Sequence, residues 1–293
     1  MPELPEVQSV VNYYRPLLTK LKLSGISSPN NYKKVFDTHS VFDLNKIIKG
    51  QSIVDIQRRG KYIIFDLNNG HLCIHLRMTG QLQMEIDDAD QMKHCSAAII
   101  FSNGKKLFFK DYRKFGRIYY FEDLSIINNK LGVEPLSPAF NNDFLYKVLK
   151  KSKGMIKPLL LNQKYIAGLG NIYIDESLWK AKIHPKKKSL TISKPKIKTL
   201  SEAIPKILNQ AIEFNGTTII NFSYGNQVSG EFKQFLKVFD RQGNPCLRCK
   251  TVLKKIFVSQ RGTHYCPQCS YTASTAKAAV SYTHLTLPTI YSV

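Results

Sequence analysis

The sequence lacks any apolar run close to the roughly 18 residues that cross a bilayer, so no membrane-spanning helix is expected. It is poor in acidic residues, with 21 Asp and Glu against 43 Lys and Arg, which leaves a formal net charge of +22. Six cysteines in 293 residues are too few for a disulfide scaffold. The first residues, which include Pro2, Glu3 and Pro5, lack the basic and then apolar pattern of a signal peptide, so we expect a cytoplasmic protein, or a nuclear or organellar one in a eukaryotic host.

The excess of basic residues indicates the kind of partner. With 43% hydrophobic and 22% charged residues the composition is globular, and 293 residues predict about two domains at roughly 150 residues each. A pI near 9.7 favours a polyanionic partner. The segment from Lys147 to Lys198 carries 14 lysines and two acids, so we expect it to follow nucleic-acid phosphates, with a merely solvated face as the alternative.

The pattern of apolar residues changes along the chain. Helical spacing predicts a helix over Leu4–Leu18, whereas residues 50–121 consist of short β-branched and aromatic runs interrupted by Asn69-Gly70 and Asn103-Gly104. These signals predict hairpins of a β-sandwich or barrel. The runs lie at Ser52–Ile56, Tyr62–Leu67, His71–Leu76, Ala97–Phe101, Lys106–Phe109 and Arg117–Phe121. After Gly132–Pro138 the spacing becomes helical.

We therefore expect an α+β multidomain protein with four segments. These are a helix and β-rich domain (1–134), a helical domain with the basic, nucleic-acid-binding surface (135–240), a four-cysteine finger (241–272) and a tail (273–293). The last 17 residues, Lys277–Val293, carry one charge and no strand or helix pattern, so we expect the tail to be disordered or non-native.

Four of the cysteines form two pairs with the spacing of metal ligands. Each pair has two intervening residues, and 16 residues separate the pairs, so four thiolates can surround one zinc ion. No histidine or water position stands out, which predicts a closed structural site. The ligands are Cys246, Cys249, Cys266 and Cys269.

The N-terminus carries a second candidate site. A small second residue such as Pro2 normally permits removal of Met1, and the free prolyl amine would then stand at the start of a helix. An α-amine has a pKa near ~8, so part of it is neutral and nucleophilic at physiological pH. On residue types alone, an inert helix-starting proline is the alternative.

Three motifs in separate regions resemble the formamidopyrimidine-DNA glycosylase (Fpg) family of bacterial repair enzymes. They are PELPEV at residues 2–7, GLGNIY at 168–173 and the four-cysteine finger, supported by RGKY, HLRMTG, DYRKFG and GVEPL. The resemblance implies an N-terminal helix with a two-layer β-sandwich, a helix–two-turn–helix domain and a zinc-finger β-hairpin. It also implies a bifunctional glycosylase and abasic-site lyase acting on oxidised purines in double-stranded DNA.

The resemblance implies a role for each matching residue in catalysis. Pro2 matches the nucleophile that attacks C1′ and forms a Schiff base, and Glu3 matches the proton donor at the sugar. Lys61 matches a lysine linked to β-elimination, although alone it reads as a solvated strand-end lysine. Arg261 matches the finger arginine linked to δ-elimination, although alone it reads as a solvated hairpin residue.

The resemblance also implies DNA contacts, because a glycosylase must flip its target nucleotide and fill the hole. Met78, Arg113 and Phe115 match the void-filling residues; without the resemblance, Met78 and Phe115 read as core residues. Asn171 matches a phosphate-holding residue and is also a candidate helix N-cap. The remaining predicted contacts, with Ser152 standing where a lysine is expected, are Glu6, His94, Lys153 and Lys157.

Two other functions fit parts of this pattern. One is an endonuclease VIII-like glycosylase for oxidised pyrimidines, although Leu4 favours the purine branch. The other is a DNA-binding protein that keeps the fold without chemistry, although Pro2, Glu3 and Lys61 are all present. We expect a monomer with one structural Zn²⁺, no membrane partner, and a lesion-capping loop within Thr217–Glu231.

Overall fold

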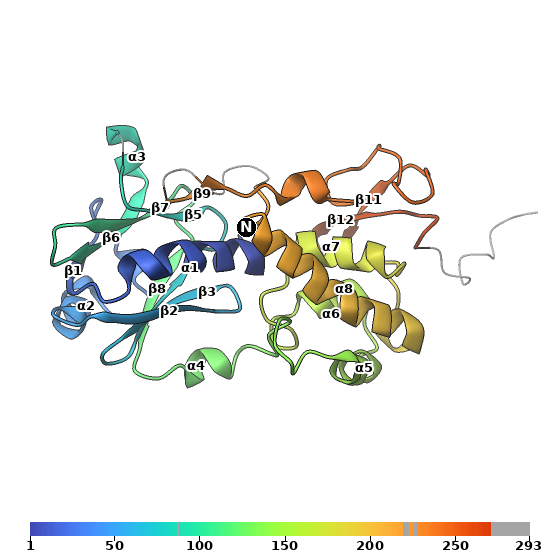
Figure 1. Ribbon diagram of the computed structural model, residues 1–293, viewed down its shortest axis with the longest axis horizontal. Helices are drawn as coiled ribbons and strands as arrows, with labels where there is room; N and C mark the ends of the chain where they lie inside the picture. Colours follow the sequence, from blue (N-terminus) through green and yellow to red (C-terminus); the bar gives the residue numbers. More distant parts are fainter. Residues whose placement is uncertain (87, 219–222, 226–227, 271–293) are drawn as a thin grey trace, which may run out of the picture.

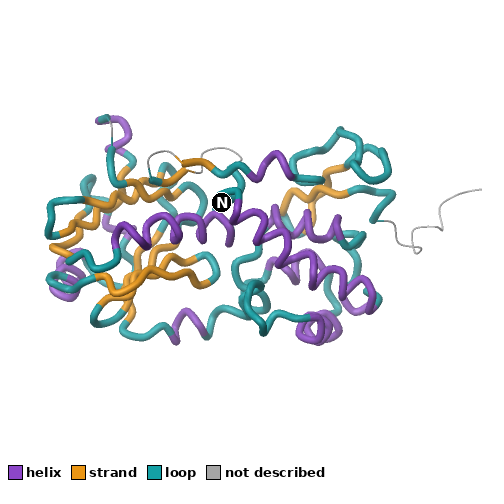
Figure 2. The backbone as a smooth tube through the Cα atoms, viewed as in Figure 1, coloured by secondary structure: helices purple, strands orange, loops and turns teal. Residues whose placement is uncertain are grey.

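The computed structural model describes residues 1–86, 88–218, 223–225 and 228–270. A β-rich half and a helical half lie side by side, and the N-terminus lies between them (Figure 1). Helix α1 (Leu4–Leu18) begins at this junction and runs along the β-rich half. Figure 2 shows that the strands of the finger lie beside the helical half. The predicted tail lies outside the described residues.

The β-rich half is a sandwich of two four-stranded antiparallel sheets. One sheet has the order β1-β6-β7-β5 and the other β2-β3-β4-β8. Side chains of both sheets and of α1 share one hydrophobic core, which confirms the predicted sandwich. The strands are β1 (Leu23–Ser27), β2 (Ile53–Arg59), β3 (Tyr62–Leu67), β4 (His71–His75), β5 (Gly80–Gln83), β6 (Cys95–Phe101), β7 (Lys106–Asp111) and β8 (Arg117–Phe121).

Both predicted turn signals join paired strands. Gly70 has φ +71° and closes the β3–β4 hairpin, and Gly104 has φ +83° and closes β6–β7. The sequence pattern did not predict β1 or β5, which are short and complete the edges of one sheet. Nor did it predict the helices of this half, η1 (Lys33–Val35), α2 (Val41–Ile48), α3 (Ala89–Lys93) and α4 (Ser125–Asn128).

The helical half has its own core. Its elements are α5 (Asn142–Lys151), α6 (Ile156–Leu161), α7 (Asn171–Lys180), η2 (Ser189–Thr191), α8 (Lys194–Glu213) and η3 (Phe232–Phe235). Leu4, at the start of α1, packs into this core, whereas Val7 and later residues of α1 pack into the sandwich. Helix α1 therefore joins the two cores, and the first residues of the chain sit at their boundary.

Two hairpins complete the described chain. The first is β9 (Ser223–Tyr224) with β10 (Val228–Ser229), and the finger hairpin is β11 (Lys254–Val258) with β12 (Arg261–Tyr265). Tyr224, which lies within the predicted capping loop Thr217–Glu231, is buried in the sandwich core. None of the described helices is both long and apolar enough to span a bilayer.

Candidate active site and metal centre

The first turn of α1 holds two glutamates in a reciprocal cap. Glu3 is the N-cap, and its backbone N–H donates to Glu6 Oε2 at 2.7 Å. Glu6 Oε1 accepts from the backbone N–H of Thr217 at 2.7 Å and from the Tyr173 hydroxyl. Buried Glu6 thus ties α1 to α7 and to the start of the predicted capping loop; the direct DNA contact predicted for it stays a prediction.

The Glu3 carboxyl is almost fully enclosed, with the residue 3% exposed. Its Oε1 accepts from the backbone N–H of Ile172 at 3.1 Å, while Oε2 has no hydrogen-bond partner among the described residues. Burial raises the pKa of Glu3 to about 7, although the charge of Lys61 lowers it. A Cβ at Gly170 would lie 2.2 Å from Glu3 Cδ, so only glycine fits there. Glu3 can therefore carry a transferable proton near neutral pH.

Lys61 is not the solvated strand-end lysine that its local sequence suggests, because it is only 7% exposed. It follows Gly60, which has φ +58° in the β2–β3 turn. Burial lowers the pKa of Lys61, while the charges of Glu3 and Glu6 raise it and that of Arg261 lowers it. Lys61 therefore lies within electrostatic reach of the candidate acid and of the finger arginine.

A carboxylate from outside the hairpin holds the turn before Lys61. Glu134 Oε1 accepts from the Gly60 N–H at 2.6 Å and from Arg59 Nη1 at 2.9 Å, and Glu134 Oε2 lies 2.7 Å from Arg58 Nη2. Burial raises the pKa of Glu134, but the charge of Arg58 and the hydrogen bonds from Arg58, Gly60 and Arg59 together outweigh burial and keep the pKa below its ordinary value. Glu134 lies in the GVEPL motif, but the sequence pattern indicated no role for it.

Arg261 begins β12 and is exposed. The next residue is held, because the carbonyl of Gly262 accepts from Asn171 Nδ2 at 2.8 Å. The N-cap alternative for Asn171 is wrong: Gly170 is the N-cap of α7, and Asn171 is the first helical residue. Its side chain reaches across to the finger instead. Its predicted phosphate contact stays a prediction.

The three predicted void-filling residues lie on two linked loops. Met78 is 41% exposed and Phe115 is 46% exposed, so the alternative interpretation of both as core residues is wrong. The guanidinium of Arg113 lies 4.9 Å from the Phe115 ring centroid. Thr79 Oγ1 donates to Asp111 and accepts from the Arg113 N–H at 3.1 Å, which joins the two loops. The site thus presents an apolar side chain, a cation and an aromatic ring to solvent.

The other predicted DNA contacts fall in different environments. His94 is half-buried, with its ring 4.3 Å from that of Tyr112, and Lys153 is exposed after α5. Lys157 is 0% exposed, and its ammonium lies 2.6 Å from Asp175 Oδ1. For His94, Lys153 and Lys157 a direct contact with DNA stays a prediction. For Lys157 such a contact requires the ammonium to leave its ion pair with Asp175.

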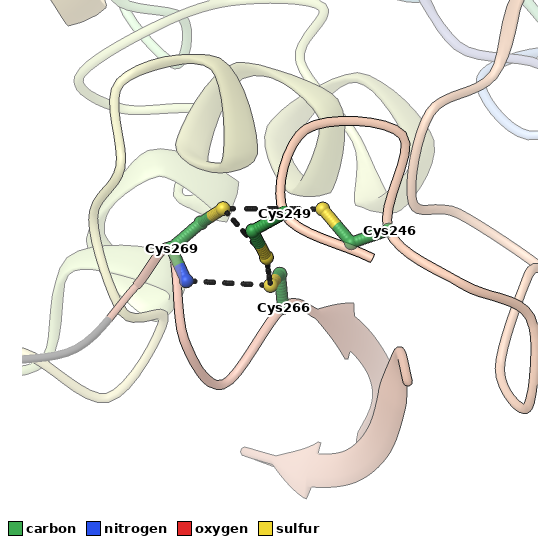
Figure 3. Close-up of side chains that lie close together, drawn as sticks. All are labelled: Cys246, Cys249, Cys266 and Cys269. Atoms are coloured by element: carbon green, nitrogen blue, oxygen red, sulfur yellow. Dashed lines mark hydrogen bonds between the residues drawn. The ribbon is translucent and has the colours of Figure 1, made fainter. Parts of the chain in front are cut away.

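The four finger cysteines converge on one point (Figure 3). Their Sγ atoms all lie within 4.8 Å of one another, with Cys249 Sγ 3.4 Å from both Cys266 Sγ and Cys269 Sγ. A tetrahedron with Zn–S bonds of about 2.3 Å has S···S edges of roughly 3.8 Å, so the donor set fits zinc. Trp179 Nε1 donates to Cys246 Sγ at 3.4 Å, which supports the thiolate from α7. These residues form one closed structural zinc site.

Three family descriptions match successive parts of the chain. "Formamidopyrimidine-DNA glycosylase N-terminal domain" matches residues 1–118, "Formamidopyrimidine-DNA glycosylase H2TH domain" matches 131–223, and "Zinc finger found in FPG and IleRS" matches 243–270. Two relatives, the formamidopyrimidine-DNA glycosylases of Pelotomaculum thermopropionicum and Herpetosiphon aurantiacus, are each 39% identical, over 274 and 272 residues. Each match covers 92% of this chain and 99% of the relative.

Solved structures with similar folds contain DNA. The complex of wild-type Lactococcus lactis Fpg (MutM) with N7-benzyl-Fapy-dG DNA has a TM-score of 0.85 at 35% identity. A MutM complex with carbocyclic 8-oxo-G DNA has a TM-score of 0.84 at 36% identity. Both matches cover 92% of this chain and 100% of the solved chain.

Proposed function

Since the chain belongs to the formamidopyrimidine-DNA glycosylase family, we propose that it excises 8-oxoguanine and formamidopyrimidines paired with cytosine from double-stranded DNA. It is a DNA glycosylase of base-excision repair with abasic-site lyase activity. The observation that carries the proposal is the enclosed Glu3 carboxyl, which has a pKa of about 7 and directly follows Pro2. An acid beside a prolyl amine is what opening a sugar ring requires.

The first steps need Pro2 as a free secondary amine, because a prolyl nitrogen acylated by Met1 is an amide without nucleophilic lone pair. After removal of Met1, the Pro2 nitrogen attacks C1′, and the base leaves with the electron pair of its bond to C1′ and takes up the proton that the Pro2 ammonium loses. Glu3 gives its proton to O4′ as the C1′–O4′ bond opens, which leaves an iminium on the sugar. The placement of Glu3 and the buried Lys61 in one electrostatic cluster supports this assignment.

Two eliminations then cut the strand. Loss of a C2′ proton breaks the C3′–O bond, for which we propose Lys61. Loss of a C4′ proton breaks the C5′–O bond, for which we propose Arg261 as the group that holds the departing phosphate. Water finally hydrolyses the iminium and regenerates the amine. The outcome is a one-nucleotide gap with phosphate at both ends.

The remaining residues are proposed to bind and distort the duplex. Met78, Arg113 and Phe115 fill the space left by the flipped nucleotide, and their exposure on linked loops supports this role. Asn171, His94 and the basic helical surface hold phosphates. The division into residues 1–134, 135–240 and 241–272, and action as a monomer in the bacterial cytoplasm, belong to the same proposal.

Borohydride trapping tests the chemistry. Untagged protein lacking Met1 is expected to form a covalent adduct with a duplex that contains one 8-oxoguanine opposite cytosine, and none with undamaged duplex. Pro2→Gly and a verified Met1-retaining form are expected to lose base excision while they keep lesion binding. Unchanged excision by the Met1-retaining form would refute the Pro2 assignment. An adduct on thymine glycol alone would indicate the endonuclease VIII-like branch, and binding without any adduct would indicate a protein without chemistry.

A further inference from the structure

One buried carboxylate in the middle of α7 contacts two elements that are distant in sequence. Asp175 Oδ1 accepts from Lys157 Nζ of α6 at 2.6 Å, and Asp175 Oδ2 accepts from the backbone N–H of His264 in β12 at 2.8 Å. Both charged side chains are fully enclosed. Lys157 Nζ also lies 3.4 Å from the carbonyl of Gly262. The ion pair therefore joins the helical half to the finger hairpin.

The next residue of α7 holds the other end of the finger. Glu176 is buried and accepts backbone N–H bonds from Lys237, Val238 and Phe239 at 2.8 to 3.0 Å, where the chain enters the finger. Consecutive residues of a helix point in different directions, so the adjacent acids Asp175 and Glu176 can bind two separate segments of the chain. The zinc module is thus fixed to α7 on both its entry segment and its hairpin.

These contacts converge on the residue after Arg261. The Gly262 carbonyl receives Asn171 Nδ2 at 2.8 Å and Lys157 Nζ at 3.4 Å, and the His264 amide binds Asp175. The side chain of Arg261 is exposed, but the backbone of the next three residues is held by these three hydrogen bonds. An exposed side chain on a fixed backbone is suited to meet a phosphate at a set position.

We infer that Lys157 and Asp175 are positioning residues, which fix the finger hairpin so that Arg261 meets the phosphate lost in the second elimination. This inference rests on the role proposed for Arg261. It assigns Lys157 an action through the finger rather than through a contact with DNA. An apolar pair of similar size stabilises a core at least as well as a buried ion pair, so stability alone does not account for these charges. Burial lowers the pKa of Lys157 and the charge of Asp175 raises it, as the enclosed geometry requires.

Single-turnover assays on the 8-oxoguanine duplex separate the steps. Base release is measured from the strand cleavage found after alkali treatment. The ratio of δ- to β-elimination product is measured in samples that receive no alkali. In Lys157→Met the ratio is expected to fall about tenfold, because a displacement of ~1 Å can cost that much or more. Base release is expected to change by less than about threefold, since no group that contacts C1′ is lost. Exposed Lys206 on α8 gives the matched control, Lys206→Met.

A second variant separates position from stability. Lys157→Met/Asp175→Asn removes both charges, so it is expected to recover thermal stability while it keeps the low product ratio. Recovery of the ratio together with stability would overturn the inference, as would an unchanged ratio in Lys157→Met.

Amide hydrogen exchange on the free protein gives a readout that does not depend on chemistry. The amide of His264 is expected to lose protection in Lys157→Met and not in Lys206→Met. If the wild type releases no base, the proposed function fails; if Arg261→Ala leaves the product ratio unchanged, only the role of Arg261 fails. Unchanged protection of His264 would show that the Lys157–Asp175 pair does not fix the finger hairpin.

Discussion

Glu3 shows how burial prepares a residue for chemistry, as the largest of several effects on its pKa. Its carboxyl lies among α1, the glycine turn before α7 and Lys61, and burial raises its pKa to about 7. The protonated form is therefore present below pH 7 and is lost above it. We expect the single-turnover rate of base excision to fall as pH rises through about 7. In Glu3→Gln the rate should drop roughly 10²- to 10⁴-fold, and the fall of the rate with rising pH near 7 should disappear. If the rate of Glu3→Gln still fell with pH near 7, that pH dependence would belong to another group.

The same shift predicts a change in stability with a definite sign. Between the ordinary value of 4.5 and about 7, the folded state holds a proton that the unfolded state has lost, so the free energy of unfolding falls as pH rises through this window. Glu3→Gln should therefore exceed the wild type in stability at pH 8, by up to about 3 kcal/mol, and match it at pH 4. Urea denaturation at both pH values measures the difference, with the exposed Glu202→Gln as control.

At the scale of elements, the turn between β2 and β3 depends on a carboxylate from the connection to the helical half. Glu134 binds Arg58, Arg59 and the Gly60 amide, and the Arg58 side chain is only 7% exposed. Glu134→Gln leaves that nearly buried guanidinium without an anionic partner, with only Gln8 and the Gly60 carbonyl to accept from it, so we expect a loss of about 3 kcal/mol in the free energy of unfolding. Because the lowered pKa of Glu134 supplies stability above its ordinary value of 4.5, wild type and variant should converge as pH falls.

Lyase activity gives a second measure of the Glu134 variant. Displacement of Gly60 moves Lys61, so β-elimination on a preformed abasic site should slow more than duplex binding weakens. The exposed Glu213→Gln at the end of α8 should leave both stability and β-elimination unchanged. Equal stability of Glu134→Gln and Glu213→Gln would contradict the structural role of Glu134.

At the scale of the whole molecule, zinc binding determines whether the finger folds. The hydrophobic cluster around the site is small, with Val238 and Leu253 beside the buried cysteines, so ligation must supply much of the folding energy. Cys249→Ser should lose the zinc and bind lesion duplex roughly 10- to 150-fold more weakly, because the contact of Arg261 with a phosphate is worth about 1.5–3 kcal/mol. Zinc analysis and fluorescence titration measure both. Cys95→Ala, which removes a buried thiol far from the finger, should keep the zinc.

The sequence by itself determined the features that depend on neighbouring residues. Helix α1 and strand β3 begin and end at the predicted residues, because apolar spacing and Asn-Gly turns act over a few positions. The two cysteine pairs predicted the zinc site for the same reason, since ligand spacing is local. The family motifs pointed to the candidate catalytic residues.

Only the tertiary structure decided the state of those residues. Lys61 and Lys157 look alike in the sequence as two lysines in basic segments, yet both are buried, one near Glu3 and Arg261 and the other bound to Asp175. The partners Glu134, Asp175 and Glu176 act on residues 18 to 89 positions away, so no local pattern indicated their roles. Burial and long-range contact set protonation and position, and both arise only when the β-rich half, the helical half and the finger pack together.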